Sequence, residues 1–442
     1  MSTLTSLLVV GCAGAEDPCG ADALRMPPSG GGANVVVILV DDIGIDKIDA
    51  YGPHAATPST PTFDALSETG LRFEQAYTSP TCSPTRAGLL TGRRPARTTI
   101  GTWIGNESGS ERSLPDDELT LPELLTGYHS ALAGKWHLSA LLDEPHLGAL
   151  RQGFAHHWGP IANPTMAVRP VEGTLDWWRW QKSTDGELTI VERYLTEETT
   201  DDAIHFAQTL DEPFFLLVAY NGAHTPLHTP PAHLLDGPVG SEDADLLDAM
   251  ITSVDHEVGR LLATLDPADT TVFVLADNGT HGDFMRPPYD PTHGKGTAFD
   301  EGVHVPMWAW GRGVSAVGRS TAALVHVTDL FATIADLAGV PTDTLERPID
   351  GVSFAPLLTA PYTPWRRCVL SEGFTDGNDA ASRRHRGVRD GRFELVQLPG
   401  QRAVLHDTHT PPDQRVDLLA ERLEPEARAA HSVLRRALAK TP

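Results

Sequence analysis

The stretch SPTCSPTRAGLLTG, residues 79–92, places a cysteine, a proline and an arginine at alternate positions: Cys82, Pro84 and Arg86. Proline suits the first turn of a helix, because the N–H that it lacks has no partner there. We therefore expect a helix that starts near Pro84 and ends at Gly92, since glycine accepts the left-handed conformation that closes many helices. Cys82 would then lie at a helix N-terminus, where free N–H groups and the helix dipole favour a thiolate. The stretch predicts an acidic, reactive thiol, and the alternative is a structural cysteine in the loop before the helix.

Side chains with oxygen ligands follow two predicted strands. Residues 34–40 and 271–276 are short apolar runs with many β-branched residues, which is typical of buried parallel strands. Carboxylates at the end of a buried strand are costly unless a cation holds them, and α/β folds place ligands at this edge of the sheet. Such oxygens suit Ca²⁺ or Mg²⁺ better than a metal that prefers thiolates. A solvated turn is the alternative for the Asp-Asp pair taken alone. We expect a divalent cation at these residues: Asp41, Asp42, Asp277 and Asn278.

Side chains that carry protons follow two other predicted strands. Lys135 and His137 come after a short strand over residues 130–133, and alternate residues of an extended backbone point to the same side. Such a pair suits an anionic ester and its leaving group, and a surface lysine is the alternative. His224 comes after a buried strand over residues 213–220.

Taken in chain order, these motifs resemble those of the type I sulfatases. The resemblance rests on the Cys-x-Pro-x-Arg motif with its Leu-Leu-Thr-Gly tail, and on the Asp-Asp, Gly-Lys-Trp-His-Leu, His-x-Pro, Asp-Asn-Gly and His-Gly-Lys segments. Each motif is short, but six in the same order, mostly at predicted strand ends, are a specific signal. The resemblance is strong over residues 34–358 and looser beyond them. It implies an α/β alkaline-phosphatase-like sandwich, with a large, mixed, mostly parallel sheet flanked by helices. A small C-terminal subdomain with a short antiparallel sheet and a helix would complete it.

In that family a separate formylglycine-generating enzyme oxidises the motif cysteine, here Cys82, to formylglycine. One hydroxyl of the hydrated aldehyde attacks sulfur and the alcohol leaves. The second hydroxyl then expels sulfate and restores the aldehyde, whereas a plain serine or cysteine would stay trapped as a stable ester. The implied reaction is hydrolysis of a sulfate monoester, on a sulfated carbohydrate or on an aryl sulfate.

The resemblance also implies a role for each matching residue. Arg86 and the cation would support the ionised hydrate. Lys135, His224 and Lys295 would bind sulfate oxygens and stabilise charge in the transition state. His224 or Lys295 would protonate the leaving alkoxide, and His137 would take up the proton when sulfate is expelled. Ca²⁺, with Mg²⁺ as the alternative, would be held by Asp41, Asp42, Asp277, Asn278 and the modified Cys82.

Three other functions stay open at this point. A phosphonate or phosphate monoester hydrolase of the same superfamily would use nearly the same residues. A sulfotransfer or phosphotransfer enzyme would need an acceptor alcohol. A catalytically inactive glycan-binding protein is the alternative from a different class, and it is disfavoured because each core motif residue is present.

The chain of 442 residues has a formal net charge of -25. This charge argues against nucleic acid and anionic membrane surfaces as electrostatic partners. An anionic substrate therefore needs a locally positive pocket. With 40% hydrophobic and 21% charged residues, the composition is that of an ordinary globular protein.

The first 33 residues are predicted to lie outside the catalytic domain. Residues 4–12 form a short apolar run that ends in Cys12 and resembles a bacterial lipobox, although no lysine or arginine precedes the run. We expect an exported protein, periplasmic or membrane-anchored through a lipid at Cys12, and a disordered leader is the alternative. Residues 14–33 would form a Gly/Pro-rich tether. The predicted division is 1–33 for the leader, 34–358 for the catalytic domain and 359–442 for the C-terminal subdomain.

The chain holds four cysteines: Cys12, Cys19, Cys82 and Cys368. So few cysteines in a chain of this length predict no disulfide framework. We expect Cys368 to be a small core residue without a role at a site.

Residues 142–194 form an insertion that is rich in aromatic side chains, among them Trp158, Trp177, Trp178 and Trp180. Carbohydrate rings stack well on tryptophan, so the insertion is a candidate wall of the substrate pocket. A separate hydrophobic cluster is the alternative, and it is slightly favoured.

Overall fold

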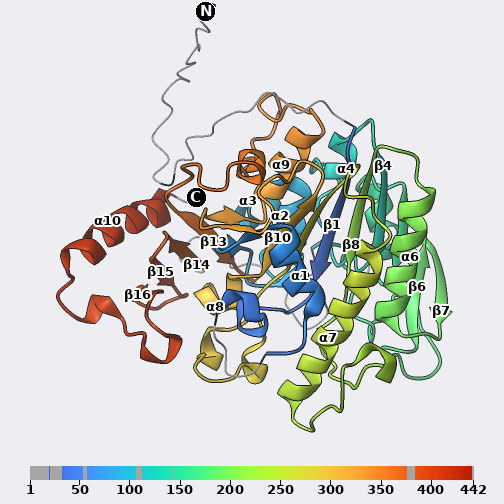
Figure 1. Ribbon diagram of the computed structural model, residues 1–442, viewed down its shortest axis with the longest axis horizontal. Helices are drawn as coiled ribbons and strands as arrows, with labels where there is room; N and C mark the ends of the chain where they lie inside the picture. Colours follow the sequence, from blue (N-terminus) through green and yellow to red (C-terminus); the bar gives the residue numbers. More distant parts are fainter. Residues whose placement is uncertain are drawn as a thin grey trace, which may run out of the picture.

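The computed structural model describes Cys19 and residues 32–52, 57–105, 112–141, 143–375 and 384–440. Within these residues ten strands form one sheet in the order β11-β2-β10-β9-β1-β8-β4-β5-β6-β7 (Figure 1). The central strand β1 (Asn34–Val40) pairs in parallel with β8 (Phe214–Ala219) and β9 (Thr270–Ala276). Every residue of these three strands is buried, so both faces of the sheet are covered, as their apolar sequences predict.

Strands on both sides of this centre complete the large sheet. β4 (His129–Gly134) pairs in parallel with β8 and with β5, while β10 pairs antiparallel with β9 and β2. The insertion after β4 supplies three outer strands, so it extends the sheet. The outer strands are β5 (His156–Gly159), β6 (Trp180–Thr184), β7 (Glu187–Val191), β10 (Met307–Gly311), β2 (Leu71–Phe73) and β11 (Arg319–Thr321). A separate two-stranded sheet joins β3 (Ala76–Tyr77) to β12 (Val325–His326).

Two groups of helices pack on the sheet, and members of each group contact one another. The first group is α1 (Pro61–Thr69), α6 (Leu195–Thr209) and α7 (Asp243–Leu262). The second is α2 (Cys82–Thr91), α4 (Leu121–Leu124) and α9 (Asp329–Leu337). Shorter helices are α3 (Pro95–Thr98), α5 (Gly148–Arg151) and α8 (Asp300–Val303). None of the helices that the structure describes is long and apolar enough to cross a membrane.

The register of the parallel strands aligns their carboxyl ends. Leu39 of β1 and Gly134 of β4 are both aligned with Ala219 of β8, and Val40 of β1 is aligned with Ala276 of β9. Parallel strands in this register end at the same edge of the sheet. The segments that follow β1, β4, β8 and β9 therefore leave the sheet side by side.

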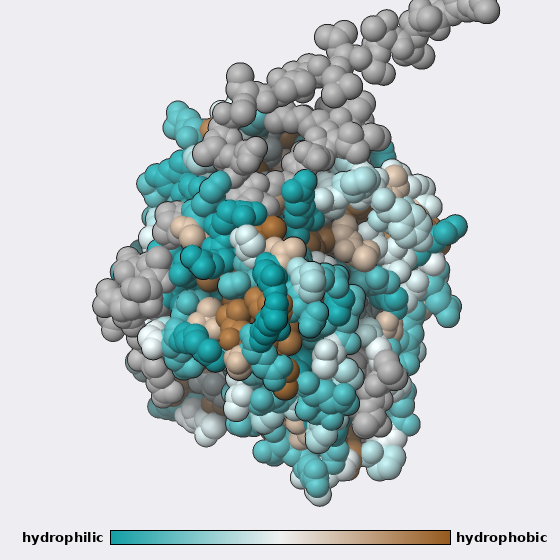
Figure 2. Space-filling view, turned by 90° about the vertical axis from the view of Figure 1, so that its left-hand side faces the viewer, coloured by the Kyte–Doolittle hydropathy of each residue, from teal (hydrophilic) through white to brown (hydrophobic). Residues whose placement is uncertain are grey.

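The C-terminal part forms a second, four-stranded antiparallel sheet, as the resemblance implies. Its strands follow in order: β13 (Val369–Gly373), β14 (His385–Arg389), β15 (Phe393–Gln397) and β16 (Val404–Asp407). Asp390 forms the tight turn between β14 and β15, because its Oδ1 accepts from the N–H groups of Arg392 and Phe393 at 2.8 and 2.7 Å. α10 (Pro425–Lys440) packs on β14 and β15. The face with these elements is mostly hydrophilic in Figure 2. The boundaries at 33/34 and 358/359 stay predictions.

Two predictions are wrong, that the cysteines form no disulfide framework and that Cys19 lies in a tether outside the fold, whereas Cys368 is a buried core residue as expected. Cys368 is buried, but it forms a disulfide with Cys19 across 349 residues of sequence. The N–H of Arg367 also donates to the carbonyl of Cys19 at 3.2 Å, and Cys19 packs against the C-terminal core. Cys19 is therefore attached to the fold, although it lies in the predicted tether. The sequence could not reveal this pair, because the two cysteines meet only after β13 is in place. Cys12 lies outside the described residues.

Candidate active site

Cys82 lies at the N-terminus of α2, as predicted, although the helix begins at Cys82 itself, two residues before the expected start at Pro84. Gly92 closes the helix with a left-handed φ of 67°. All ten residues of α2 are buried, so the thiol lies inside the molecule. Its Sγ is 3.4 Å from Oδ1 of Asp41, which follows β1. Cys82 is the free cysteine of the described residues. The helix N-terminus and the shared edge of the parallel strands therefore meet at Cys82.

The prediction of an acidic thiol at Cys82 is wrong for the unmodified residue. Burial raises the pKa of Cys82 well above its ordinary value, and the carboxylates of Asp277 and Asp41 raise it further. These effects outweigh the helix N-terminus and the nearby lysines, because a buried anion beside two others lacks solvation. The thiol is therefore protonated at neutral pH.

The four predicted oxygen ligands come together at the same edge. Asp41, Asp42, Asp277 and Asn278 are all buried. The backbone N–H of Asp42 donates to Oδ1 of Asp277 at 3.2 Å, and the Asn278 amide donates to Oδ1 of Asp42 at 2.8 Å. Burial raises the pKa of Asp277 to about 7, and the Asp41 carboxylate adds to this effect. Asp277 therefore needs further positive charge nearby to be an anion.

Three cations face these carboxylates. The Arg86 guanidinium lies 3.1 Å from Asp277 and 3.5 Å from Asp41, and it also donates to the carbonyl of Lys135 at 2.9 Å. The Lys135 ammonium contacts Oδ2 of Asp41. Three carboxylates and three cations thus balance in charge, and a divalent cation would make the site net positive. A site of this kind attracts an anionic ester inside a protein of net charge -25.

Lys295 is the third of these cations, and it comes from the loop after β9. Its Nζ lies 2.5 Å from Oδ1 of Asp42. Burial lowers the pKa of Lys295, but the carboxylates of Asp42, Asp41 and Asp277 outweigh burial and raise it. Lys295 is therefore charged, as its predicted role requires.

His224 follows β8 and joins the acidic cluster. Its Nε2 is 3.8 Å from Oδ2 of Asp42, and its Nδ1 is 2.8 Å from the carbonyl of Thr225. One ligand atom from each of four residues lies within 4.8 Å of the others, and the four are Asp41, Asp42, Cys82 and His224. Burial lowers the pKa of His224 to about 4, and the Lys295 charge acts in the same direction. The imidazole is therefore neutral beside the carboxylates.

The reasoning that paired Lys135 with His137 on an extended backbone is wrong. β4 ends at Gly134, and His137 has a left-handed φ of 58°. His137 is nevertheless buried. It lies next to the start of α2, because its carbonyl accepts a hydrogen bond from the Ser83 hydroxyl at 2.8 Å. Burial and the cations of Lys135 and Arg86 hold the pKa of His137 well below its ordinary value.

The hydrogen bonds of His137 fix its tautomer. Nε2 lies 2.8 Å from the carbonyl of Ile104, so it carries the proton, because a carbonyl only accepts. Nδ1 is buried and has no hydrogen-bond partner among the described residues. Nδ1 can therefore accept a proton, which is the role that the resemblance implies for His137.

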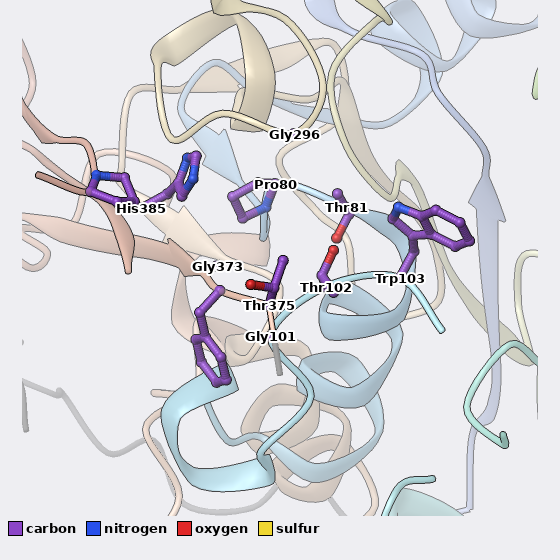
Figure 3. Close-up of a pocket in the computed structure, with 11 residues that line it drawn as sticks. Pro80, Thr81, Gly101, Thr102, Trp103, Gly296, Gly373, Thr375 and His385 are labelled. Carbon is purple, nitrogen blue, oxygen red and sulfur yellow. The ribbon is translucent and has the colours of Figure 1, made fainter. Parts of the chain in front are cut away.

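A cavity of about 400 Å³ adjoins the start of α2, because Pro80 and Thr81, which directly precede Cys82, line it. Figure 3 shows His385 on one side of it and Trp103 on the other, with Thr81 and Thr102 between them. Gly296, next to Lys295, and Phe374 also line it. Sequence reasoning missed Thr102, Trp103, Phe374 and His385, because they come from the loop after α3, from the residue after β13 and from β14, where no motif marks them.

Comparisons with known proteins agree with this geometry. A model of the sulfatase family matches residues 33–340. The N-acetylgalactosamine-6-sulfatase of Sus scrofa is 31% identical over 389 residues, which are 80% of this chain and 69% of the relative. Arylsulfatase A of Bos taurus is 34% identical over 388 residues, which are 80% of this chain and 70% of the relative. The solved structure of Ps i-CgsB in complex with k-i-k-neocarrahexaose has a TM-score of 0.77 at 22% identity and covers 92% of both chains.

The mixed sheet, the buried helix N-terminus and the site at the strand ends define an enzyme of alkaline-phosphatase-like fold that acts on anionic esters. More particularly, the chain belongs to the sulfatase family and is a sulfuric ester hydrolase. The structure brings together all the residues that the sequence analysis singled out for the site. It adds His385 and the cavity beside it.

Proposed function

We propose that this sulfatase cleaves sulfate monoesters of sulfated sugars through formylglycine at residue 82, with Ca²⁺ as the bound cation. The observation that carries this proposal is the position of Cys82 at the buried start of α2, with its Sγ within 4.8 Å of ligand atoms of Asp41, Asp42 and His224. The hydrated aldehyde supplies the nucleophile and the step that releases sulfate. Because Cys82 is only 1% exposed in the fold, the formylglycine-generating enzyme has to act before folding is complete.

The side chains around residue 82 supply charge and proton transfer. Lys135 and Lys295 each lie against one carboxylate of the site, so both ammonium groups are held where sulfate oxygens would bind. Charge that develops on those oxygens is stabilised by groups already in position, which is the most effective form of electrostatic catalysis. His137 accepts a proton at Nδ1 when sulfate is expelled. The leaving alkoxide takes its proton from the charged Lys295, or from His224 when its imidazole has first gained a proton at Nε2.

The donor set fits a hard divalent cation. Three carboxylates and one amide converge, and Oδ1 of Asn278 is buried without a hydrogen-bond partner among the described residues. Oxygen donors of this kind hold Ca²⁺, with Mg²⁺ as the alternative. When bound, the cation supplies Lewis acidity toward a sulfate oxygen. The residues that would hold it are Asp41, Asp42, Asp277 and Asn278.

The Asn278→Ala variant is expected to bind Ca²⁺ at least about tenfold more weakly, because it removes one oxygen donor. Calcium content after dialysis and the Ca²⁺ dependence of kcat measure this effect. Asn34→Ala is the matched control, since Asn34 is equally buried but lies at the opposite end of β1, where it pairs with Glu212 at 2.8 Å. Full calcium content and an unchanged rate in Asn278→Ala would contradict the assignment of the ligands.

Sugar sulfates are favoured over aryl sulfates as substrates. The relatives include N-acetylgalactosamine-6-sulfatases, and one similar structure contains D-glucosamine-2-N, 6-O-disulfate. The cavity beside Thr81 and Gly296 has polar groups on its walls, and burial leaves Nδ1 of His385 without a partner among the described residues. The His385 imidazole lines this cavity, and a turn of the ring would bring a nitrogen to a hydroxyl of the sugar that carries the sulfate.

The His385→Ala variant is expected to lower kcat/KM up to about tenfold for a sugar sulfate, because one hydrogen bond contributes about 0.5–1.5 kcal/mol. Sulfate release is measured for N-acetylgalactosamine 6-sulfate, galactose 6-sulfate, p-nitrophenyl sulfate and p-nitrophenyl phosphate. His256→Ala on the exposed face of α7 is the control. Faster cleavage of the phosphate than of the sulfate by the parent enzyme would favour the phosphomonoesterase alternative. An equal loss on all four substrates would remove His385 from sugar binding.

We further propose that the protein is exported and anchored by a lipid at Cys12. The disulfide between Cys19 and Cys368 supports export, because such bonds persist in oxidising compartments. A tryptic peptide that links Cys19 to Cys368 is expected from non-reduced protein of the producing cells. The protein should fractionate with membranes, and Cys12→Ser should release it. Reduced Cys19 and Cys368 in the native protein would count against export. A parent protein that stays in the soluble fraction would count against the lipid anchor.

A further inference from the structure

An aromatic cluster lies beside the loop that carries His224. It consists of Trp177, Trp178, Tyr194 and His228, and we call it the Trp178 cluster. The Trp178 ring lies 5.0 Å from that of His228 and 5.4 Å from that of Tyr194. The Trp177 ring also packs against His228, with its centroid 4.6 Å from that of the imidazole. Three of the four residues come from the C-terminal half of the aromatic insertion, residues 142–194, for which the sequence analysis left two interpretations open.

Most of the cluster is rigid core. Trp177 and Tyr194 are 1% and 3% exposed. The Trp177 indole N–H donates to the carbonyl of Pro226 at 2.8 Å, and the Tyr194 hydroxyl lies 3.0 Å from Nε2 of His228 and 3.3 Å from the Ser253 hydroxyl. To this extent the insertion is the hydrophobic cluster that the sequence favours. These contacts hold the His228 ring in place.

Trp178 differs from the rest of the cluster. It is 41% exposed, and it is the tryptophan with a large exposed surface among the described residues. Its backbone is fixed, because its N–H donates to Oδ1 of Asp176 at 2.8 Å. A fixed, exposed indole on a buried aromatic base offers a flat apolar surface to a ligand at little cost in conformational entropy.

The cluster is close to the reaction centre. His228 follows His224 by four residues, so their Cα atoms are at most about 14 Å apart. Thr225 and Pro226 between them are exposed, so no segment that the structure describes covers these two residues. A chain whose sulfated end lies at His224 could therefore continue over Thr225 and Pro226 to reach Trp178.

The charges near Trp178 select for a neutral ligand. Asp176 lies beside it. The neighbouring cation, Arg179, is already engaged, because its Nε lies 3.6 Å from Glu192 and its Nη1 donates to the carbonyl of Thr174 at 3.2 Å. The protein as a whole is strongly acidic. A second sulfate group would be repelled here, whereas the C–H face of a neutral sugar ring stacks on indole without any need for charge.

We propose that Trp178 and His228 form a subsite for a neutral sugar unit of a glycan chain, next to the unit that carries the sulfate. This inference rests on the proposed function and makes it more specific. The enzyme would act on oligosaccharides in preference to sulfated monosaccharides. Stacking at Trp178 would supply affinity that the acidic protein surface cannot supply by charge.

The variants Trp178→Ala and Trp178→Phe test this subsite, with Tyr362→Ala as the control at another exposed aromatic residue, 73% exposed. The probes are a κ-carrageenan hexasaccharide, in which every second sugar unit carries no sulfate, and galactose 4-sulfate, which is the sulfated unit of that chain. Trp178→Ala should lower the ratio of kcat/KM for the hexasaccharide to that for the monosaccharide about tenfold, equivalent to about 1.4 kcal/mol. Trp178→Phe should keep most of the ratio. The loss should persist in about 0.5 M salt, because salt at this concentration screens interactions between exposed charges.

Binding without turnover separates this subsite from the proposed function. Calorimetry with the neutral probes galactohexaose and cellohexaose measures the stacking contact whether or not any sulfate is cleaved. We expect one of them to bind the parent protein and to bind Trp178→Ala about tenfold more weakly. The subsite is refuted if neither probe binds the parent protein, or if Trp178→Ala leaves both the binding and the kcat/KM ratio unchanged. Lack of sulfate release together with probe binding would refute only the proposed function.

Discussion

The Cys82→Ser variant is expected to lose steady-state turnover by about 10⁴-fold or more, the largest effect of any single substitution in this chain. Serine has nearly the size of cysteine, so the buried start of α2 should keep its fold. The variant lacks the thiol that maturation converts into an aldehyde. A serine hydroxyl could at most form a sulfate ester once, because it has no second hydroxyl with which to expel sulfate.

The measurement is sulfate release over many turnovers, with the protein co-expressed with a formylglycine-generating enzyme. The mass of the peptide that contains residue 82 shows in parallel whether the parent thiol has become an aldehyde. Cys368→Ser is the control for a cysteine-to-serine change away from the site, because Cys368 directly precedes β13 and is bound to Cys19. A parent enzyme that is active while its Cys82 thiol is unmodified would overturn the formylglycine proposal. So would a Cys82→Ser variant with multiple turnovers.

The Arg86→Met variant is expected to lose both activity and stability. Arg86 is 2% exposed, and among the described residues it is the cation that contacts two carboxylates of the site, Asp277 and Asp41, at 3.1 and 3.5 Å. Removing one partner of a buried ion pair leaves an uncompensated charge, which costs about 3–5 kcal/mol. The loss of a fixed positive group near the nucleophile should lower kcat by about 10²–10³-fold.

Calcium should distinguish the two effects of Arg86→Met. The metal-free variant should show the full loss of stability in denaturant unfolding, and added Ca²⁺ should restore part of it by supplying positive charge beside Asp277. The rate should stay low, because the guanidinium is still missing. Arg97→Met is the control: its partner Asp350 lies at 3.0 Å, but the Arg97 side chain is 34% exposed, and such pairs contribute at most about 1 kcal/mol. Equal losses in the two variants would contradict a special role for Arg86.

Much of the fold follows from local patterns. The apolar runs that become β1, β8 and β9 are hydrophobic along their whole length because both faces of these strands are covered. The start of α2 at Cys82 and its end at Gly92 follow from residues within one or two turns of each end. The insertion after β4 gave no such signal, and it proved to extend the sheet by three strands.

The candidate site was predicted by residue but not by geometry. Sequence motifs indicated Asp41, Lys135 and Asp277, yet they could not show that Lys135 contacts Asp41 or that Arg86 lies between the two carboxylates. Residues 41 and 135 are 94 positions apart, and only the strand order brings them together. The backbone of His137 was also not predicted, because β4 ends at Gly134 and His137 has a left-handed φ where an extended backbone was expected.

The sequence by itself determined the buried central strands, the helix that starts at Cys82 and the family of the chemistry, since each of these is encoded by residues that are neighbours in the chain. Tertiary structure alone decided three other features: the disulfide between Cys19 and Cys368, the cavity with His385, and the raised pKa of Cys82. The physical reason is the same in each case. Contacts between distant segments depend on which strands pair, and the pKa of a buried group depends on the burial and the charges that the completed fold places around it.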